Sequence, residues 1–536
     1  MKSINRFVML SLALSVTVSL TSCKKNKSTP DAENTTQTST TDRVALTNDS
    51  LFLYAKEVYF WNESLPSYDA YNPRQFTKAG TDILNYETNL INIAKVSGSA
   101  DYLSASNSTK YSYIEDIRDR NPAATGAVPL TRASVDLEGN GNDVGIYAIS
   151  PVTEDNITYK LFILAVSQNS PADRNGLTRG AYITKINTTA IGGDFDRERT
   201  VINSTIYGDP NTLYLEGVRT DGSSFKVTLN KTSYKSSPIY KTNVLTVSGK
   251  TIGYVAYARF SNAENSEEEL TNIFNDFKVK NVTDLIVDLR YNGGGYISTA
   301  EHLANLIAPE GTTGTMYVEH YNNKLKNRKS TDATILSHQP FTDANDVIQY
   351  ENGKMLTFAD IDYSVTGNTR PFKKVAGLTT VQNVVFIVSG GTASSSEMLI
   401  NSLKPKMNVK LVGEQTYGKP VGFFPIRIEN RYDVLYAMFE VKNSLGEGNY
   451  YSGFTPDVDA GYDYGDFDFG NPSDEYLAAA IKVLAPGSRA TGVVSKNALM
   501  SISGIKSKAA SSKVLEGVSE DRSFKGMIET RHNIRN

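Results

Sequence analysis

The sequence predicts a multidomain α/β protein with an N-terminal helical domain, a β-rich middle domain and a larger α/β core. Three patterns predict it. Apolar residues fall at helical spacing near the start of the folded part, short β-type runs separated by Gly, Asn and Asp fill residues 130–232, and strand and helix patterns alternate from Ile252 onward. A chain of 536 residues is long enough for two or three such domains.

The first residues have the layout of a secretory signal. Lys2 and Arg6 precede an apolar run, Phe7–Leu20, that is too short to span a bilayer comfortably. The Leu-Thr-Ser-Cys sequence ending at Cys23 resembles the lipobox of bacterial lipoproteins. This implies a lipid anchor at Cys23 that tethers the protein to a membrane of the bacterial cell envelope, on the periplasmic side or the outer surface. The alternative is a generic signal peptide with a chance cysteine.

Two stretches are predicted to carry little structure. Residues 24–44 are rich in Thr, Ser, Asn and Lys and are expected to be a flexible linker. Residues 487–536 alternate Ser, Lys, Gly and Ala with scattered apolar positions, so a weakly ordered tail is expected there. Cys23 is the only cysteine, which excludes a disulfide within the chain.

Residues 45–125 are predicted to form the helical domain. The apolar residues from Leu51 to Val58 fall at i, i+3, i+4 and i+7, and a second helical pattern runs from Pro73 to Ala94. Four aromatic residues in this domain are interpreted as core rather than as a ligand site: Phe52, Tyr59, Phe60 and Trp61.

The β-rich domain, residues 133–235, carries the run SPADRNGL at Ser170–Leu177, followed by a strand pattern to Asn187. This resembles the helix-and-strand signature of PDZ domains, with Ala181 where an Asp is usual. The resemblance implies an edge strand and carboxylate-binding loop that capture a peptide C-terminus by strand addition, formed by Val144, Gly145, Ile146 and Tyr147. The alternative is a β-rich domain without a peptide groove.

The core, residues 236–486, places glycine-rich turns after two buried strands. Asp284–Arg290 runs into Tyr291-Asn292-Gly293-Gly294-Gly295, and a helix follows. Since strands and helices alternate here, we expect a largely parallel sheet with functional groups at the carboxyl ends of its strands. Residues 309–374 are interpreted as an irregular insertion.

The second turn offers a nucleophile. Val384–Val388 is a strand pattern broken by Ser389-Gly390-Gly391, and a helix pattern follows, so Ser394, Ser395 or Ser396 falls at a helix N-terminus. A further strand and a loop then present Lys419.

A serine nucleophile requires a base and an oxyanion site. The four histidines lie in uninformative contexts, whereas a lysine becomes a base when burial lowers its pKa, which makes Lys419 a candidate. Backbone amides of Gly293–Gly295 and of the residue after the nucleophile would converge if the strands at Ile286 and Phe386 are neighbours.

Three motifs, DLRYNGGG, GGTASSSE and GEQTYGK, follow the PDZ-like segment in that order. Together they resemble the C-terminal processing (tail-specific) peptidases of the S41 serine peptidase family, over residues 140–485. The resemblance implies a catalytic core of the ClpP/crotonase type that needs no metal or other cofactor. It also implies a dyad of Ser394 as nucleophile and Lys419 as general base, with oxyanion donors in Gly294 and Ser395. Gly293 is the second choice for the glycine.

The implied substrates are proteins or peptides with free C-termini, and a formal net charge of −3 gives no reason to expect a nucleic acid partner. Two positions depart from the family pattern. Phe423 stands where a Gln often orients the lysine, and Pro405 stands where many members have an Asp. Phe423 motivates an alternative, an inactive envelope lipoprotein that binds peptides as an adaptor. A glycan-binding surface lipoprotein is the remote third hypothesis.

Overall fold

The computed structural model describes residues 39–118, 135–153, 157–343, 347–374, 377–378, 380–487, 513–518 and 525–535. The predicted signal with Cys23 and most of the predicted linker lie outside the described residues. Within these ranges, none of the helices has the length and apolar character needed to cross a membrane.

The predicted helices form, with one shifted boundary. The first helix begins at Arg43 because the side chain of Asp42 accepts a hydrogen bond from Val44 N. The second does not begin at Pro73, which opens a short 3₁₀ turn, but at Asp82, after the N-cap Thr81. The helices are α1 Arg43–Val58, α2 Tyr68–Tyr71, α3 Asp82–Ser97, α4 Pro171–Arg174, α5 Phe195–Ile206, α6 Ala263–Val279, α7 Ile297–Ile307, α8 Asn323–Asn327, α9 Ser395–Leu403 and α10 Glu475–Leu484.

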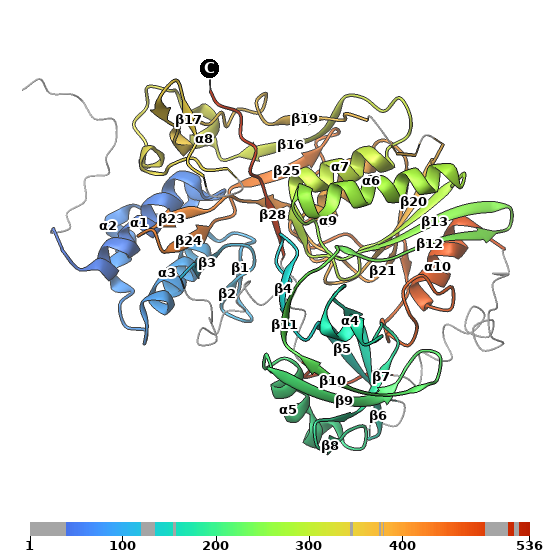
Figure 1. Cartoon of the computed structure of the whole chain (residues 1–536). Helices are drawn as coiled ribbons and strands as arrows, with labels where there is room; N and C mark the ends of the chain where they lie inside the picture. Colours follow the sequence, from blue (N-terminus) through green and yellow to red (C-terminus); the bar gives the residue numbers. More distant parts are fainter. Residues whose placement is uncertain are drawn as a thin grey trace, which may run out of the picture. The chain divides into compact units, whose positions relative to one another are not determined.

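A six-stranded sheet forms the centre of the core (Figure 1). Its order is β12 Ile239–Val247, β13 Lys250–Tyr257, β14 Asp284–Asp288, β20 Asn383–Val388, β21 Asn408–Gly413 and β26 Val458–Asp459. Only β12 is antiparallel to its neighbour. The largely parallel sheet was expected, and the condition stated for the convergence of the two turns is met, since Ile286 pairs with Val385 and Val287 with Phe386.

Alternate residues of these strands face opposite helix layers, because successive side chains point to opposite faces of a sheet. Val287 and Phe386 share one apolar cluster with α6, α7 and α9, while Ile286 and Val385 share another with α10. The first cluster also contains buried residues of α1 and α3, so the helices of the N-terminal region pack into the same core as the central sheet.

The β-rich region forms a separate sheet over a cluster of its own. The order is β10 Ser224–Asn230, β9 Thr212–Val218, β7 Tyr182–Ile186, β6 Tyr159–Val166, β5 Ile146–Thr153 and β27 Lys513–Val514, with β8 Thr189–Ala190 beside β7. β5 is therefore not a free edge along its whole length.

Short strands complete the structure. They form β1 Tyr102–Leu103 with β2 Ser108–Thr109; β4 Asn140–Asp143 with β11 Thr232–Lys235; β15 Gly294–Tyr296 with β28 Gly526–Ile528; β17 Tyr350–Glu351 with β18 Lys354–Met355; β3 Tyr113–Asp116 with β24 Tyr432–Leu435 and β23 Ile426–Ile428; and β16 Thr315–Tyr321 with β19 Thr369–Pro371, β25 Phe439–Asn443 and β22 Val421–Gly422.

The prediction of a weakly ordered tail is wrong for residues 513–518 and 525–535. Both stretches form strand pairs, and Met527 and Glu529 are almost fully buried. Local composition did not indicate this, because the partners of these residues lie hundreds of positions earlier in the chain and supply both the backbone hydrogen bonds and the apolar surroundings.

Candidate active site

Ser394 lies at the junction of β20 and α9, where the sequence predicted a nucleophile. It is the N-cap of α9, with φ 61° and ψ −110°, a backbone region that L-residues rarely adopt. The residue is fully buried, and its Oγ donates no hydrogen bond to any described residue. Strain of this kind costs about 1–3 kcal/mol and is frequent at functional sites.

The glycine turn of Asn292–Gly295 is fastened to the start of α9. Ser395 Oγ donates to the carbonyl of Gly295 at 2.7 Å, and Ser396 Oγ donates to that of Asn292 at 3.0 Å. Of the three candidate serines, these two therefore hold the turn, and Ser394 alone keeps an uncommitted hydroxyl.

The predicted oxyanion donors lie beside Ser394. Ser395 is the first residue of α9, and the first amides of a helix have no acceptor within it. The amide of Gly294 donates to Asn292 Oδ1 at 3.0 Å. A Cβ on Gly294, whose φ is 110°, would lie 3.1 Å from Ser394 Cβ, so the glycine permits a close approach to the serine.

Glu397 joins the serine to the lysine loop, a role that sequence reasoning missed. Its Oε2 accepts hydrogen bonds from the backbone amides of Ser394 at 2.9 Å and Lys419 at 2.8 Å. Its Oε1 accepts from Gly418 N at 2.8 Å and Thr416 Oγ1 at 2.5 Å. The signal was present, since a Glu three residues after a helix N-cap serine is a capping pattern.

Lys419 is buried in the loop that follows β21, with 1% of the residue exposed. Its Nζ donates to the carbonyl oxygens of Lys525 at 2.7 Å and Tyr111 at 3.3 Å, and lies 4.6 Å from the ring centroid of Phe423. Burial lowers the pKa of Lys419 to about 7, although Asp101 and Glu397 favour the charged form. A lysine with this pKa is largely neutral just above neutrality.

Tyr111 supplies part of what the missing Gln would provide. Besides accepting from Lys419 through its carbonyl, it donates from its hydroxyl to the carbonyl of Gly418 at 2.8 Å. Asp101 accepts from Tyr111 N at 2.7 Å and fixes the position of this carbonyl. Both residues come from the N-terminal region, and no sequence motif pointed to them.

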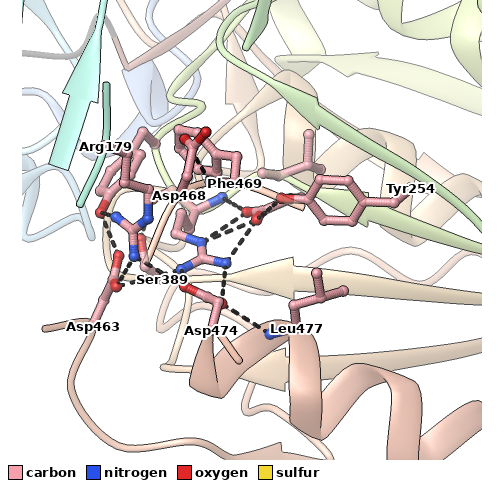
Figure 2. Close-up of polar contacts among 12 residues, drawn as sticks. Arg179, Tyr254, Ser389, Asp463, Asp468, Phe469, Asp474 and Leu477 are labelled. Carbon is pink, nitrogen blue, oxygen red and sulfur yellow. Dashed lines mark hydrogen bonds and ion pairs between the residues drawn. The ribbon is translucent and has the colours of Figure 1, made fainter. Parts of the chain in front are cut away.

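A buried charge network surrounds Arg290, which stands just before the glycine turn in the sequence, and Figure 2 shows its polar contacts. Arg290, two residues before Asn292, bonds Asp288 at 2.7 Å and Asp474 at 2.8 Å. Arg179, from the β-rich region, bonds Asp474 at 3.1 Å, pairs with Asp463 and donates to Tyr291 Oη at 2.7 Å. This network therefore connects the β-rich region to the residue next to the turn.

The other predicted site residues are placed as follows. Val144 O and Gly145 O accept hydrogen bonds from Ala172 N and Ser167 N, which closes the loop before β5. Ile146 pairs with Val166 within the sheet. Tyr147 lines a cavity of about 570 Å³ that also touches Gly293 and Gly294, and so opens toward the turn.

His302 bonds Thr271 at 2.9 Å, on the helices that cover the sheet. No group of three or more His, Cys, Asp and Glu side chains in the described part of the chain is arranged to hold a metal ion.

Comparison with known proteins adds a family match. Residues 251–460 match the model of Peptidase family S41. A Staphylococcus aureus (strain N315) protein named "Probable CtpA-like serine protease" is 25% identical over 323 residues, 60% of this chain and 53% of that protein. The "Carboxy-terminal processing protease CtpA" of Bacillus subtilis (strain 168) is 24% identical over 262 residues, 48% of this chain and 44% of that protein. The chain spans about half the length of these curated relatives.

The fold has a counterpart among solved structures. A crystal structure from Bacteroides fragilis NCTC 9343, of a protein whose name assigns it to the S41 proteases, aligns with a TM-score of 0.53 at 21% identity. The alignment covers 84% of this chain and 98% of that one. The sequence matches support a serine-type peptidase, and this alignment supports the fold of the described chain.

Proposed function

Proceeding from the S41 peptidase domain at residues 251–460, we propose that the chain is a serine endopeptidase that uses a dyad of Ser394 and Lys419. One observation carries this proposal. A buried lysine with a pKa of about 7 and a strained N-cap serine with an uncommitted hydroxyl are joined through one carboxylate oxygen of Glu397.

The proposed reaction is acyl transfer. Neutral Lys419 accepts the proton of Ser394 Oγ, which attacks the carbonyl carbon of a peptide bond. The tetrahedral oxyanion is stabilised by the amides of Ser395 and Gly294, with Gly293 as second choice, each donor contributing ~3 kcal/mol. Protonated Lys419 gives its proton to the leaving amine, and water then hydrolyses the acyl-enzyme by the same steps.

The bonds of Lys419 are compatible with this role. A neutral amine has two N–H groups and one lone pair, and the carbonyls of Tyr111 and Lys525 accept two hydrogen bonds. The lone pair stays available to accept the Ser394 proton, although Ser394 Oγ donates no hydrogen bond to any described residue and the two side chains must approach each other for the transfer. Gly294 requires one rearrangement, because its amide must leave Asn292 Oδ1 before it can stabilise an oxyanion.

We further propose that the β-rich domain is PDZ-like and captures the C-terminus of a protein substrate at Val144–Tyr147. The cavity lined by Tyr147, Gly293 and Gly294 supports a route from there to the glycine turn. Anchoring through Cys23 would hold the protein to the cell envelope.

The test of catalysis is cleavage of an unfolded protein, followed by mass spectrometry. Two lengths are compared, the chain from residue 24 onward and the same chain without residues 519–536. Ser394→Ala and Lys419→Ala should each abolish cleavage while leaving thermal unfolding unchanged.

Ser402→Ala is the matched control, because Ser402 is a buried serine of the same helix whose Oγ also has no partner among the described residues. It should cleave at the wild-type rate. Cleavage by Ser394→Ala would refute the dyad, and peptide binding without cleavage by both wild-type lengths would favour the adaptor.

The anchor is tested by membrane fractionation of bacteria expressing the full chain. Wild type is expected with the membranes and Cys23→Ala in the soluble fraction. Equal fractionation of the two would refute lipidation of Cys23.

A further inference from the structure

Residues 525–535, here called the cleft segment, lie along the glycine turn and the lysine. In Figure 1 their strand, β28, is coloured dark red. β28 pairs in parallel with β15, with Gly526 opposite Gly294, and Gly526 N donates to the carbonyl of Gly293 at 3.1 Å. The segment is thus an extended peptide added as a strand beside the proposed oxyanion site.

Its other edge is bound as well. Phe423 N donates to the carbonyl of Met527 at 3.1 Å, and Lys419 Nζ donates to that of Lys525. The side chain of Met527 is fully buried. Phe423, the departure from the family pattern, therefore hydrogen-bonds an extended peptide through its backbone amide, and its ring contacts the lysine.

The later residues anchor the segment away from the dyad. The guanidinium of Arg531 bonds Glu301 at 2.8 and 2.9 Å. His532 is surrounded by Phe341, Phe358 and Phe424, whose ring centroids lie 5.1–6.0 Å away. Its two ring nitrogens are buried, with no hydrogen-bond partner among the described residues. The cleft segment therefore contacts the rest of the chain well beyond the dyad.

The cleft segment lies beside Ser394, but none of its carbonyl groups is bound at the proposed oxyanion site as that of a substrate would be. Its Gly526 carbonyl oxygen lies 2.4 Å from the point where a Cβ on Gly294 would sit, and Ser394 Cβ lies 3.1 Å from the same point. Yet the Gly294 amide donates to Asn292 rather than to a peptide carbonyl. The peptide is bound in the cleft, but the donor is not engaged with it.

An earlier stretch of the same chain pairs with β5, the strand that continues the proposed peptide groove. Val514 pairs antiparallel with Val152 of β5, and Leu515 N donates to the carbonyl of Pro151 at 2.9 Å. From the opposite side, Asn203 of α5 donates to the carbonyl of Gly517 at 2.8 Å. Residues 513–518 thus lie between β5 and α5 and run toward Val144–Tyr147.

The order of the two stretches distinguishes an inhibitor from a substrate. A substrate captured by its C-terminus presents to the dyad residues that precede those in the groove. Here the residues beside the dyad, 525–528, follow the residues that pair with β5, 513–518. The order along the chain is therefore the reverse of that expected for a substrate.

We propose that the cleft segment is an intramolecular peptide ligand that occupies the substrate cleft and inhibits the chain. The statement that this cleft binds substrate rests on the proposed function. The statement that the segment binds there does not. Tethering gives an effective concentration on the order of 1 mM, so a peptide that binds in trans with a dissociation constant of about 10 µM would leave about 1% of chains open.

The first experiment compares cleavage by the chain from residue 24 onward with that by two derivatives. One lacks residues 519–536. The other carries Arg531→Glu, which places like charges at Glu301 and retains the full length. Both should cleave an unfolded protein at least tenfold faster than the parent. Equal rates for all three would overturn inhibition.

A reversible disulfide tests whether holding the cleft segment in place prevents cleavage. Ile361 and Ile534 face each other across an antiparallel bridge, and the flanking bonds, Asp362 N to Asn533 O and Arg535 N to Asp360 O, make them a non-hydrogen-bonded pair. Such pairs have short Cα separations that suit a disulfide. Without Cys23, the variant Ile361→Cys/Ile534→Cys has no other cysteine. Oxidation should abolish the residual cleavage of the full-length chain, and reduction should restore it. Unchanged cleavage after oxidation would contradict the proposal.

A binding measurement separates this proposal from the proposed function. A labelled synthetic peptide of residues 521–536 is titrated by fluorescence anisotropy onto the shortened chain carrying Ser394→Ala. Saturable binding, lost when Met527 of the peptide is replaced by Asp, supports the proposal even if no variant cleaves. Cleavage by the shortened wild type without peptide binding overturns the proposal and leaves the proposed function standing. Removal of the segment by the wild-type chain itself, but not by Ser394→Ala, would show a substrate instead of an inhibitor and would also overturn it.

Discussion

The pH dependence of kcat is the sharpest prediction for Lys419. Burial lowers its pKa from 10.5 to about 7. A lysine acts as a base only when neutral, so kcat should rise with pH through 7 and then level off. The neutral fraction is about 0.1 at pH 6 and about 0.9 at pH 8, so kcat should increase roughly tenfold. With an unshifted pKa, the neutral fraction at pH 7 would be about a thousandfold smaller.

The assay uses the chain without residues 1–23 and 519–536 and a saturating fluorogenic peptide. At saturation the bound peptide excludes water from Lys419, as the cleft segment does in the full chain. One neighbouring group titrates in the same range, because burial raises the pKa of Glu115, which lines the cavity, to about 7. Glu115→Gln is therefore the control and should keep the inflection. A kcat that is flat from pH 6 to 8, or an inflection that disappears in Glu115→Gln, would refute the assignment of Lys419 as the base.

Three substitutions test the supports of the site. Glu397→Gln keeps the shape but puts an NH2 group in place of one carboxylate oxygen, where it faces either the amides of Ser394 and Lys419 or the amide of Gly418. Either way kcat should fall about a hundredfold and stability by about 3 kcal/mol in urea unfolding. Glu264→Gln, exposed on α6, should change neither. Gly295→Ala, at φ 134°, would put Cβ 2.1 Å from Phe260 O, so it should lower the midpoint of thermal unfolding and abolish cleavage. The control is Gly311→Ala, at φ 75° with no atom within 4 Å of its Cβ, which should lower the midpoint only slightly. Arg179→Met leaves the carboxylates of Asp288, Asp463 and Asp474 with the guanidinium of Arg290 and without that of Arg179, so the buried network carries excess negative charge. It should cost about 3–5 kcal/mol by urea unfolding, part of which Asp463→Asn in the same chain should restore. Additive losses in that pair, unchanged kcat in Glu397→Gln, or equal midpoints for the two glycine variants would contradict the structural reasoning.

The predictions that depended on short-range pattern agree with the structure. Buried strands at Asp284 and Val384 and a glycine turn after each were readable because an apolar run followed by small residues has few alternative conformations. Sequence reasoning left their adjacency as a condition, and the structure meets it, since β14 pairs with β20. Sequence reasoning from residues alone left three serines open. The structure separates them, since Ser395 and Ser396 bond the turn and Ser394 does not.

The parts that sequence reasoning missed depend on long-range contact. Tyr111 reaches Lys419 across 308 positions, and the carbonyl of Lys525 reaches it across 106. Both contacts use backbone oxygens, which every residue has, so no residue type could reveal them. The tail was predicted to be weakly ordered for the same reason, because its order is supplied by β15 and Phe423 and not by its own composition.

Phe423, which departs from the family motif, contacts the lysine in a way that the motif alone did not indicate. Reasoning from the motif, the absence of Gln at this position left the lysine without an orienting group and favoured an adaptor. In the structure, carbonyls from two distant segments accept from Nζ, and the phenyl ring lies 4.6 Å from it. The ring contributes to the burial of Nζ, and at this distance its face also attracts the ammonium. The side chain at position 423 therefore does not orient the lysine by a hydrogen bond, and its orientation is left to Tyr111 and to whichever peptide occupies the cleft.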